Sequence, residues 1–204
     1  MPRPRSLTQA QLATAALAVL DRDGLEGLSM RMVAKELGVG TMSLYRYVAD
    51  RDQLEGAIVD QVLRAVPLDL PPGTSARERL VLFAERIRKA VGEHPAAVPL
   101  LLARRHASPA ARQWGEAVLG VLADAGFSRR ESALTFRAYL SYVLGALQTD
   151  HFSPLSGPGT VALGELPEAD FPFLAGAARE ARHISPHEEF HHGLELLLRG
   201  LGLP

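Results

Sequence analysis

The stretch GLEGLSMRMVAKELGVGTMSLYRYVADRDQLEGAIVD, residues 24–60, contains short helical patterns separated by glycines. Ser29 is a favourable N-cap for one of them, because its hydroxyl can accept a hydrogen bond from the first helical turn. Gly38 suits the left-handed position that ends such a helix, and Thr41 opens the next one. A helix, a tight glycine turn and a second short helix together predict a helix-turn-helix.

The second helix of this motif, TMSLYRYV (residues 41–48), has an apolar side and a polar side. We expect Val39, Leu44 and Val48 to anchor the inner side against the rest of the domain. On the outer side, hydroxyls can bond to phosphates or base edges, and a methionine can touch a thymine methyl group. The residues expected on this recognition face are Thr41, Met42, Ser43, Tyr45 and Tyr47.

Arginines around the motif could supply the phosphate contacts on which much of DNA affinity depends. They are Arg31, Arg46 and Arg51, together with Arg3 and Arg5 in a short N-terminal arm that could reach the DNA backbone or a minor groove. The alternative interpretation is an ordinary small helical bundle with a few surface tyrosines.

Two further helices complete the N-terminal pattern. The first is expected to begin after its N-cap, Thr8, and to end at Asp23-Gly24. The other is expected to begin after its cap, Asp50, and to end before Pro67. The helix-turn-helix therefore belongs to a three-helix unit followed by a connecting helix.

The segment LDLPPGTS, residues 68–75, marks a domain boundary, because consecutive prolines and a glycine interrupt regular structure. We expect a helix-turn-helix domain with its connecting helix over residues 1–66, and a second domain over residues 67–204. Helical patterns in the second domain lie at about residues 75–93, 95–105, 109–125, 128–150, 170–182 and 185–201.

The fold class expected for the whole chain is all-α. Ala, Leu, Arg and Glu dominate, and the β-branched alternation typical of strands is almost absent. One segment, HFSPLSGPGTVALGELPEAD (residues 151–170), is so rich in Pro and Gly that we expect a long loop there. The last helix should have Ser185 as its N-cap and Pro186 at its first position.

The composition restricts the classes of protein that fit. Of 204 residues 47% are apolar, which is enough for a substantial core. A formal net charge of -1 argues against a protein that coats nucleic acid, but allows a local basic surface. Without cysteine there is no disulfide framework, thiol nucleophile or cysteine-based zinc site. Neither a signal peptide nor a membrane span is found, so we expect a cytoplasmic protein with no membrane partner.

The stretch of residues 24–60 resembles the DNA-binding domain of the tetracycline-repressor (TetR) family of bacterial transcriptional regulators, and the resemblance covers about residues 8–63. The resemblance rests on the G-L-S helix start, the A-x-x-L-G-V turn, the L-Y-x-Y-V recognition helix and a basic residue opening the next helix. It implies that Ser29 and Arg31 face the DNA backbone and that Arg51 replaces the usual phosphate-binding lysine. It also implies that the recognition face defined above reads the operator.

The rest of the chain resembles the family's C-terminal ligand-binding and dimerisation domain. The similar stretches are EHP (93–95), AGFS (125–128), YVLGALQTD (142–150) and FHHGLELLLRGL (190–201). The last stretch is similar to a helix that belongs to the four-helix dimer interface in this family. Its apolar stripe is suited to packing against a partner helix. The residues expected at the dimer interface are Phe190, His191, Leu194, Leu197, Leu198 and Leu201, with His187 on the same stripe.

Tetracycline-binding members hold a drug–magnesium complex, and here Thr149 takes the place of the metal-binding Glu. Tetracycline itself is therefore not the expected effector. We expect a small, largely apolar molecule, and no cofactor for its binding. Trp114 and Tyr139 are the first pocket candidates, because an aromatic ring with a hydrogen-bonding tip suits an apolar pocket. The alternative for each candidate is surface or core packing. The further candidates are His94, Arg105, His106, Gln148 and His151.

The segment HEEFHH, residues 187–192, contains H-E-x-x-H, the signature of zinc metalloproteases. Such an enzyme would use His187 and His191 as metal ligands and Glu188 as the general base. It would also need a third ligand and a substrate cleft, and no second motif supplies either. We therefore expect a structural or interface role for this segment and no metal, with a zinc-dependent hydrolase as the alternative.

Together these patterns predict a homodimeric DNA-binding regulator rather than an enzyme. The expected activity is repression, with release from a palindromic double-stranded operator when a small effector binds. A two-fold axis would place the two recognition helices about 34–36 Å apart, one turn of DNA. An activator, or a regulator with no small ligand, is the alternative within the same class.

Overall fold

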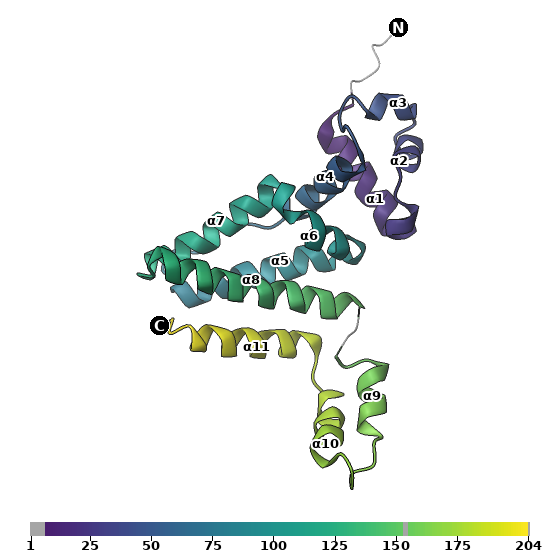
Figure 1. Cartoon of the computed structure of the whole chain (residues 1–204). Helices are drawn as coiled ribbons and strands as arrows, with labels where there is room; N and C mark the ends of the chain where they lie inside the picture. The colour runs from purple at the N-terminus through teal and green to yellow at the C-terminus, as the bar shows by residue number, and fades with distance from the viewer. Residues whose placement is uncertain (1–6, 153–154, 204) are drawn as a thin grey trace. The chain divides into compact units, whose positions relative to one another are not determined.

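The structure is a computed structural model that describes residues 7–152 and 155–203, and every element in these ranges is helical (Figure 1). The prediction of an all-α fold is therefore confirmed. By its contacts the chain divides into two compact units. One comprises the chain up to Pro71 together with Leu82–Gly120, and the other comprises Pro72–Val81 and the chain from Val121 onward.

The first unit holds the N-terminal helices and the middle of the chain. Within it the connecting helix α4 (Arg51–Arg64) contacts two other helices, α1 (Gln9–Gly27) and α6 (Val98–Arg104). The elements are α1 (Gln9–Gly27), α2 (Met30–Glu36), α3 (Thr41–Leu44), α4 (Arg51–Arg64), η1 (Pro95–Ala97), α6 (Val98–Arg104) and η2 (Arg105–Ala107), where η is a 3-10 turn, with most of α5 (Ala76–Gly92) and α7 (Pro109–Asp124).

Helix α1 begins where the sequence predicts. Thr8 and Gln11 form a capping box, in which each side chain accepts a hydrogen bond from the other residue's backbone N–H. The helix was predicted to end at Gly24 but continues to Gly27. Gly24 takes a φ of 69°, a conformation open to glycine, so the chain kinks there and then resumes its helical turn.

The predicted helix-turn-helix is present in α2 and α3. The Ser29 hydroxyl accepts a hydrogen bond from the backbone N–H of Met32 at 3.3 Å, which caps α2. Gly38 then adopts a φ of 66°, the left-handed conformation that ends the helix and turns the chain toward α3.

Helix α3 is shorter than predicted, because it ends at Leu44 instead of Val48. The backbone N–H groups of Tyr47 and Val48 both donate to the Leu44 carbonyl, at 2.8 and 3.1 Å, and the chain continues as turns. Leu44 and Val48 are buried as predicted. The prediction for Val39 was wrong: it directly follows the left-handed Gly38, which turns it outward, and it is 36% exposed.

Helix α4 begins after Asp50, as the sequence predicts. The Asp50 carboxylate accepts a hydrogen bond from the backbone N–H of Gln53 at 2.8 Å. One side of the helix is buried along its length, with Leu54 and Ile58 at 0% exposure. This burial makes α4 a central element of the first unit.

The second unit contains the C-terminal helices. They are α8 (Arg129–Phe152), α9 (Pro158–Gly164), α10 (Pro172–Ala181) and α11 (Pro186–Gly200). Ser185 caps α11 as predicted, since its hydroxyl accepts a hydrogen bond from the backbone N–H of Glu188 at 3.1 Å. Within the described residues, no helix combines the length and the apolar character needed to cross a membrane.

Helices α8 and α11 lie alongside each other (Figure 1). The Tyr142 ring lies 5.8 Å from the Phe190 ring, and the Tyr142 hydroxyl donates to the Phe190 carbonyl at 2.6 Å. Gly193 lies directly beneath Tyr142, and a Cβ atom there would come within 2.5 Å of the tyrosine oxygen. The close approach of α8 and α11 therefore depends on a glycine at this position.

The long loop predicted over residues 151–170 is partly helical, and that prediction was wrong for α9. Pro158 occupies the first helical turn, where its missing N–H costs nothing and its fixed φ favours the helix. Helix α9 packs against α10, and Arg182 donates a hydrogen bond to the Val161 carbonyl at 2.8 Å. Residues 153–154 of this segment lie outside the described residues.

Candidate nucleic-acid interface

The predicted recognition face is displayed around α3 to different degrees. Met42 is 80% exposed and Tyr45 is 46% exposed, so both rise from the surface of the helix-turn-helix. Thr41, Ser43 and Tyr47 are half-buried. The exposed thioether and phenol can reach a groove without any rearrangement of the core beneath them.

The residues predicted to face the DNA backbone differ in their exposure and in their bonding partners. Ser29 is half-buried, and its hydroxyl is engaged in capping α2. Arg31 and Arg46 are exposed, and neither forms an ion pair with the described residues. Arg3 and Arg5 lie outside the described residues.

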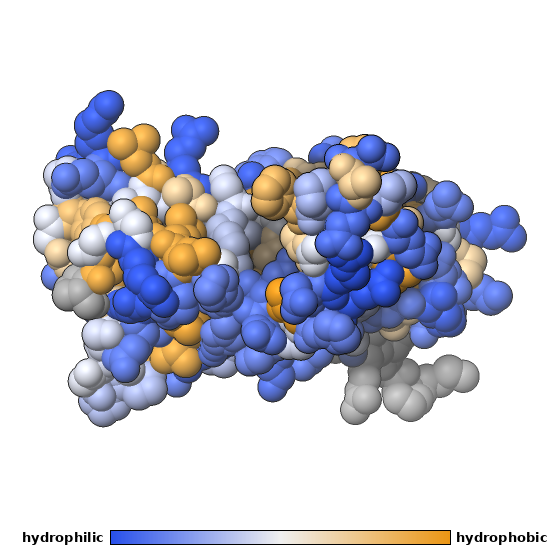
Figure 2. All heavy atoms as spheres, turned by 90° about the horizontal axis from the view of Figure 1, so that it is seen from below, coloured by the Kyte–Doolittle hydropathy of each residue, from blue (hydrophilic) through white to orange (hydrophobic). Residues whose placement is uncertain are grey.

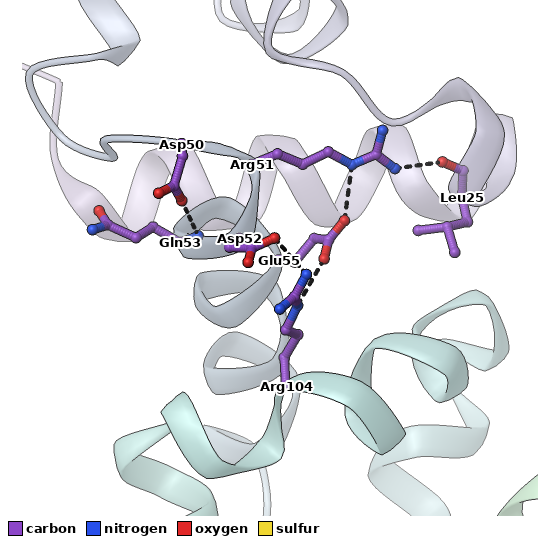
Figure 3. A network of polar contacts seen from close by, with 7 residues as sticks. All are labelled: Leu25, Asp50, Arg51, Asp52, Gln53, Glu55 and Arg104. Atoms are coloured by element: carbon purple, nitrogen blue, oxygen red, sulfur yellow. Dashed lines mark hydrogen bonds and ion pairs between the residues drawn. The ribbon is translucent and has the colours of Figure 1, made fainter.

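Arg51 has fixed partners, as Figure 3 shows. Its Nε donates to Glu55 Oε1 at 2.8 Å, and its Nη2 donates to the Leu25 carbonyl at 3.2 Å. The other carboxylate oxygen, Glu55 Oε2, accepts a hydrogen bond from Arg104 Nε at 3.0 Å. Arg104 also contacts Asp52, so α4 and α6 are joined by a continuous set of charges.

The hydrogen bond to Glu55 is the main reason that the pKa of Arg104 is raised from its ordinary value. Sequence reasoning placed Arg51 at the DNA but missed Glu55 and Arg104. The bond from Arg104 to Glu55 spans 49 positions of the chain, so no local pattern signals it.

A second polar contact joins α4 to the start of α7. Asp60 Oδ1 accepts hydrogen bonds from the Ser108 hydroxyl at 2.9 Å and from the Ala110 backbone N–H at 2.8 Å. Its other oxygen accepts one from Arg64 at 2.7 Å. Burial alone would raise the pKa of Asp60, but these hydrogen bonds outweigh it and lower the pKa below the ordinary value.

A cleft of about 490 Å³ lies within the first unit beside α4. It is bordered by α1, by the end of the recognition segment and by η2, and its lining is mixed polar and apolar. Its lining residues include Gln9, Leu12, Tyr47, Asp52, Gly56, Asp60, Arg64, Arg104 and His106. Tyr47, near the end of the segment 41–48 that carries the recognition face, therefore also lines this cleft.

The candidates for a ligand pocket are divided between the two units. Trp114 is 4% exposed and its Nε1 donates to the Phe83 carbonyl at 3.4 Å. Tyr139 is 1% exposed and its hydroxyl donates to the Leu80 carbonyl at 2.6 Å. Both side chains are core residues of their units with a bonded polar tip, which was the alternative stated for them.

The polar candidates have partners of other kinds. His94 Nδ1 lies 2.8 Å from a carboxylate oxygen of Asp21, and Arg105 donates to the Leu102 carbonyl at 2.5 Å. The His151 ring packs edge-on against Phe152. Gln148 is exposed on α8, and His106 lines the cleft beside α4.

The residues predicted for the dimer interface are distributed around α11. Phe190, Leu194 and Leu198 are 0–3% exposed because they are covered within the protomer. His191, Leu197 and Leu201 are half-buried, and His187 is exposed. Three of the six predicted interface residues are thus buried inside the chain, and Leu196 on the same helix is 54% exposed.

The HEEFHH segment places two histidines on one face of α11. The rings of His187 and His191 lie 4.3 Å apart and meet edge to face. Across the described ranges, no group of three or more His, Cys, Asp or Glu side chains is placed to hold a metal ion. His187 and His191 would account for only two of the three protein ligands that a hydrolytic zinc site needs.

Comparison with protein families adds to this geometry. Residues 12–58 match the family described as bacterial regulatory proteins, tetR family. Residues 69–203 match the family described as tetracyclin repressor-like, C-terminal domain.

Individual relatives are similar over most of the chain. An HTH-type transcriptional regulator of Saccharopolyspora erythraea is 35% identical over 175 residues, 83% of this chain and 74% of that protein. The HTH-type transcriptional repressor DrrR1 of Streptomyces coeruleorubidus is 36% identical over 157 residues, 72% of this chain and 55% of that protein. The structure of Streptomyces coelicolor ActR in complex with (S)-DNPA aligns with a TM-score of 0.86 at 26% identity, covering 97% of this chain and 98% of ActR.

Proposed function

Because the chain belongs to the TetR family of bacterial transcriptional regulators, we propose that it is a homodimeric repressor released from its operator by a small molecule. The observation that carries the DNA-binding part is the exposed surface of α3 and the residue after it, where Met42 and Tyr45 project. The residues proposed for DNA contact are those of the recognition face together with Ser29, Arg31 and Arg51.

Dimerisation is proposed through the outer faces of α8 and α11. On α8, exposed residues recur at spacings of four and three, which aligns them along one face of a helix. The ends of this face are apolar, with Leu134 at 59% and Phe152 at 56% exposure. The middle is small or polar, which allows a partner helix to approach closely. The residues are Leu134, Ala138, Ser141, Gly145, Gln148 and Phe152.

Helix α11, which contacts α8, adds Leu196 as an exposed residue and His191, Leu197 and Leu201 as half-buried ones. Figure 2 shows hydrophobic side chains at the surface seen from below, set among hydrophilic ones. An exposed apolar surface rimmed by polar residues is typical of a protein interface. Two such faces related by a two-fold axis would form a four-helix interface.

The effector is proposed to be a small, largely apolar molecule. ActR has been solved in complex with (S)-DNPA and with actinorhodin, and DrrR1 is named a repressor. Trp114 and Tyr139 remain predictions for the binding of this effector, although each ring is buried in its own unit and its polar tip bonds to a backbone carbonyl. His94, His106, Gln148 and His151 are further predictions for the binding of this molecule.

The experiment that tests this proposal is the selection of DNA fragments by the purified protein, followed by competition with a library of apolar compounds. The expected product is a two-fold symmetric sequence whose half-sites lie about one helical turn apart. Some compounds should release the selected duplex. Recovery of fragments with no common sequence would overturn the DNA-binding part, and indifference to every compound would favour a regulator without a small ligand.

A further inference from the structure

Glu55 is a buried carboxylate near the N-terminal end of α4. The residue is 7% exposed, and a buried carboxylate destabilises a fold unless it is paired. Both of its oxygens are paired, Oε1 with Arg51 and Oε2 with Arg104 (Figure 3). Arg51 lies on α4 and Arg104 on α6, so Glu55 bonds to one arginine from each of these two helices. Its carboxylate therefore has one defined position.

Arg51 is restrained along one edge of its guanidinium. Nε bonds to Glu55, and Nη2 bonds to the carbonyl of Leu25. Leu25 lies in the last turn of α1, where carbonyls lack an intrahelical donor and are open to other partners. A guanidinium carries five N–H donors in a planar fork, so these two bonds leave three donors unused. The side chain is 51% exposed, and Nη1 has no acceptor among the described residues.

This arrangement restrains the side chain of Arg51 without fully neutralising its charge. A flexible surface arginine loses side-chain freedom when it binds a phosphate, and this loss weakens binding. Arg51 has already lost that freedom to Glu55 and Leu25. The negative charge of Glu55 is shared with Arg104, so it offsets only part of the positive charge of Arg51. A planar, half-exposed fork of this kind matches the geometry of a phosphate oxygen pair.

We propose that Glu55 is a positioning residue for DNA binding, which acts through Arg51 and is itself held by Arg104. The proposal rests on the phosphate contact assigned to Arg51 under the proposed function. Glu55 touches no DNA in this scheme. Its contribution is to hold the guanidinium at the surface with its free edge toward the phosphate.

The test measures affinity for the selected operator duplex and for a random duplex of equal length, using the full-length protein. Arg51→Ala should weaken binding to both duplexes by about tenfold, because the contact is to a phosphate. Glu55→Gln should weaken binding by about three- to fivefold in the same direction, as expected when preorganisation is lost but the charge of Arg51 remains. Arg104→Gln should have a smaller effect of the same sign, and Arg104→Lys should restore most of the affinity.

The decisive measurement is Glu55→Gln in the Arg51→Ala background. If Glu55 acts through Arg51, the double variant should bind as Arg51→Ala binds, with no further loss. An equal additional loss in that background would show a merely structural role and overturn the proposal. Tighter binding by Glu55→Gln alone would also overturn it, since the carboxylate would then be competing with DNA for Arg51.

The matched control is Arg64→Ala, which removes another exposed arginine of α4 that is also paired with a buried carboxylate, Asp60. It should change DNA affinity less than Arg51→Ala and show no coupling to Glu55→Gln.

Circular dichroism and thermal melting would report whether Glu55→Gln folds. If it does not, the same double-variant comparison with Arg104→Gln decides the question. Unchanged affinity in Arg51→Ala would contradict the phosphate contact itself. If Arg51→Ala loses affinity as expected and Glu55→Gln loses none, only the positioning role is contradicted.

Discussion

Tyr45 is an exposed aromatic residue of the proposed recognition face. Because its side chain is 46% exposed, Tyr45→Ala should leave the fold intact. Loss of a base-edge or phosphate contact should weaken binding to the selected duplex by about 1–3 kcal/mol. Fluorescence anisotropy titration measures the loss, and thermal melting confirms folding. Wild-type affinity in a folded Tyr45→Ala protein would mean that the recognition face lies elsewhere.

Asp60 predicts how stability depends on pH. Its pKa in the folded chain lies below the ordinary value of 3.8, because hydrogen bonds stabilise the carboxylate. The group therefore contributes stability above pH 3.8, and this contribution is lost as pH falls through the folded pKa. Asp60→Asn should lower stability at neutral pH and reduce the further loss on acidification. Urea unfolding between about pH 3 and pH 7 measures both effects.

The control for this prediction is Asp124→Asn, which removes a carboxylate whose side chain is 64% exposed in its ion pair with Arg79. Exposed ion pairs contribute little, so this variant should keep the acid dependence of the wild type. If Asp60→Asn also kept the full wild-type dependence, Asp60 would not be a source of the acid sensitivity.

Residues whose partners lie close in the sequence were predicted well. Thr8, Ser29, Asp50 and Ser185 cap their helices as expected, because each bonds to a backbone N–H three residues ahead. Contacts between distant segments could not be predicted in this way. Hydrogen bonds such as that from Arg104 to Glu55 depend on how helices pack, which a local pattern does not encode.

At the scale of elements, helical periodicity located most helices but did not show which face of a helix meets which neighbour. The apolar stripe of α11 has the spacing expected of a buried face, and spacing alone does not distinguish a helix of the same chain from a partner's helix. The structure buries Phe190, Leu194 and Leu198 within the protomer. The surface that we propose for a partner is the outer face of α8 with Leu196.

This division of α11 into buried and exposed positions predicts opposite outcomes for two leucine variants. Leu196→Glu adds charge to a residue that is 54% exposed in the protomer, so it should dissociate the dimer and leave the protomer folded. Leu194→Asp places an unpaired carboxylate at a position with 0% exposure, and it should unfold the chain at a cost of several kcal/mol. Sedimentation velocity and circular dichroism separate the two outcomes. A dimeric Leu196→Glu protein, with Leu134→Glu also dimeric, would contradict the proposed interface.

At the scale of the whole molecule, sequence motifs were sufficient to identify the family and the all-α fold. They were less informative about the effector, because a tryptophan or tyrosine with a polar tip has the same appearance in a pocket and in a core. The tips of Trp114 and Tyr139 are bonded to carbonyls of α5, which the sequence did not indicate. Replacing either ring by alanine would therefore cost about 3–5 kcal/mol of stability and obscure any effect on a ligand.

The central claim is that effector and operator act on one dimer and weaken each other's binding. The most direct measurement is a pair of titrations with a compound that releases the selected duplex. One titration gives operator affinity with and without saturating compound, and the other gives compound affinity with and without saturating operator. Linkage predicts the same factor in both, about 5- to 150-fold for a coupling of ordinary size. A compound that binds equally tightly with and without operator would contradict the claim that this protein is a ligand-released repressor.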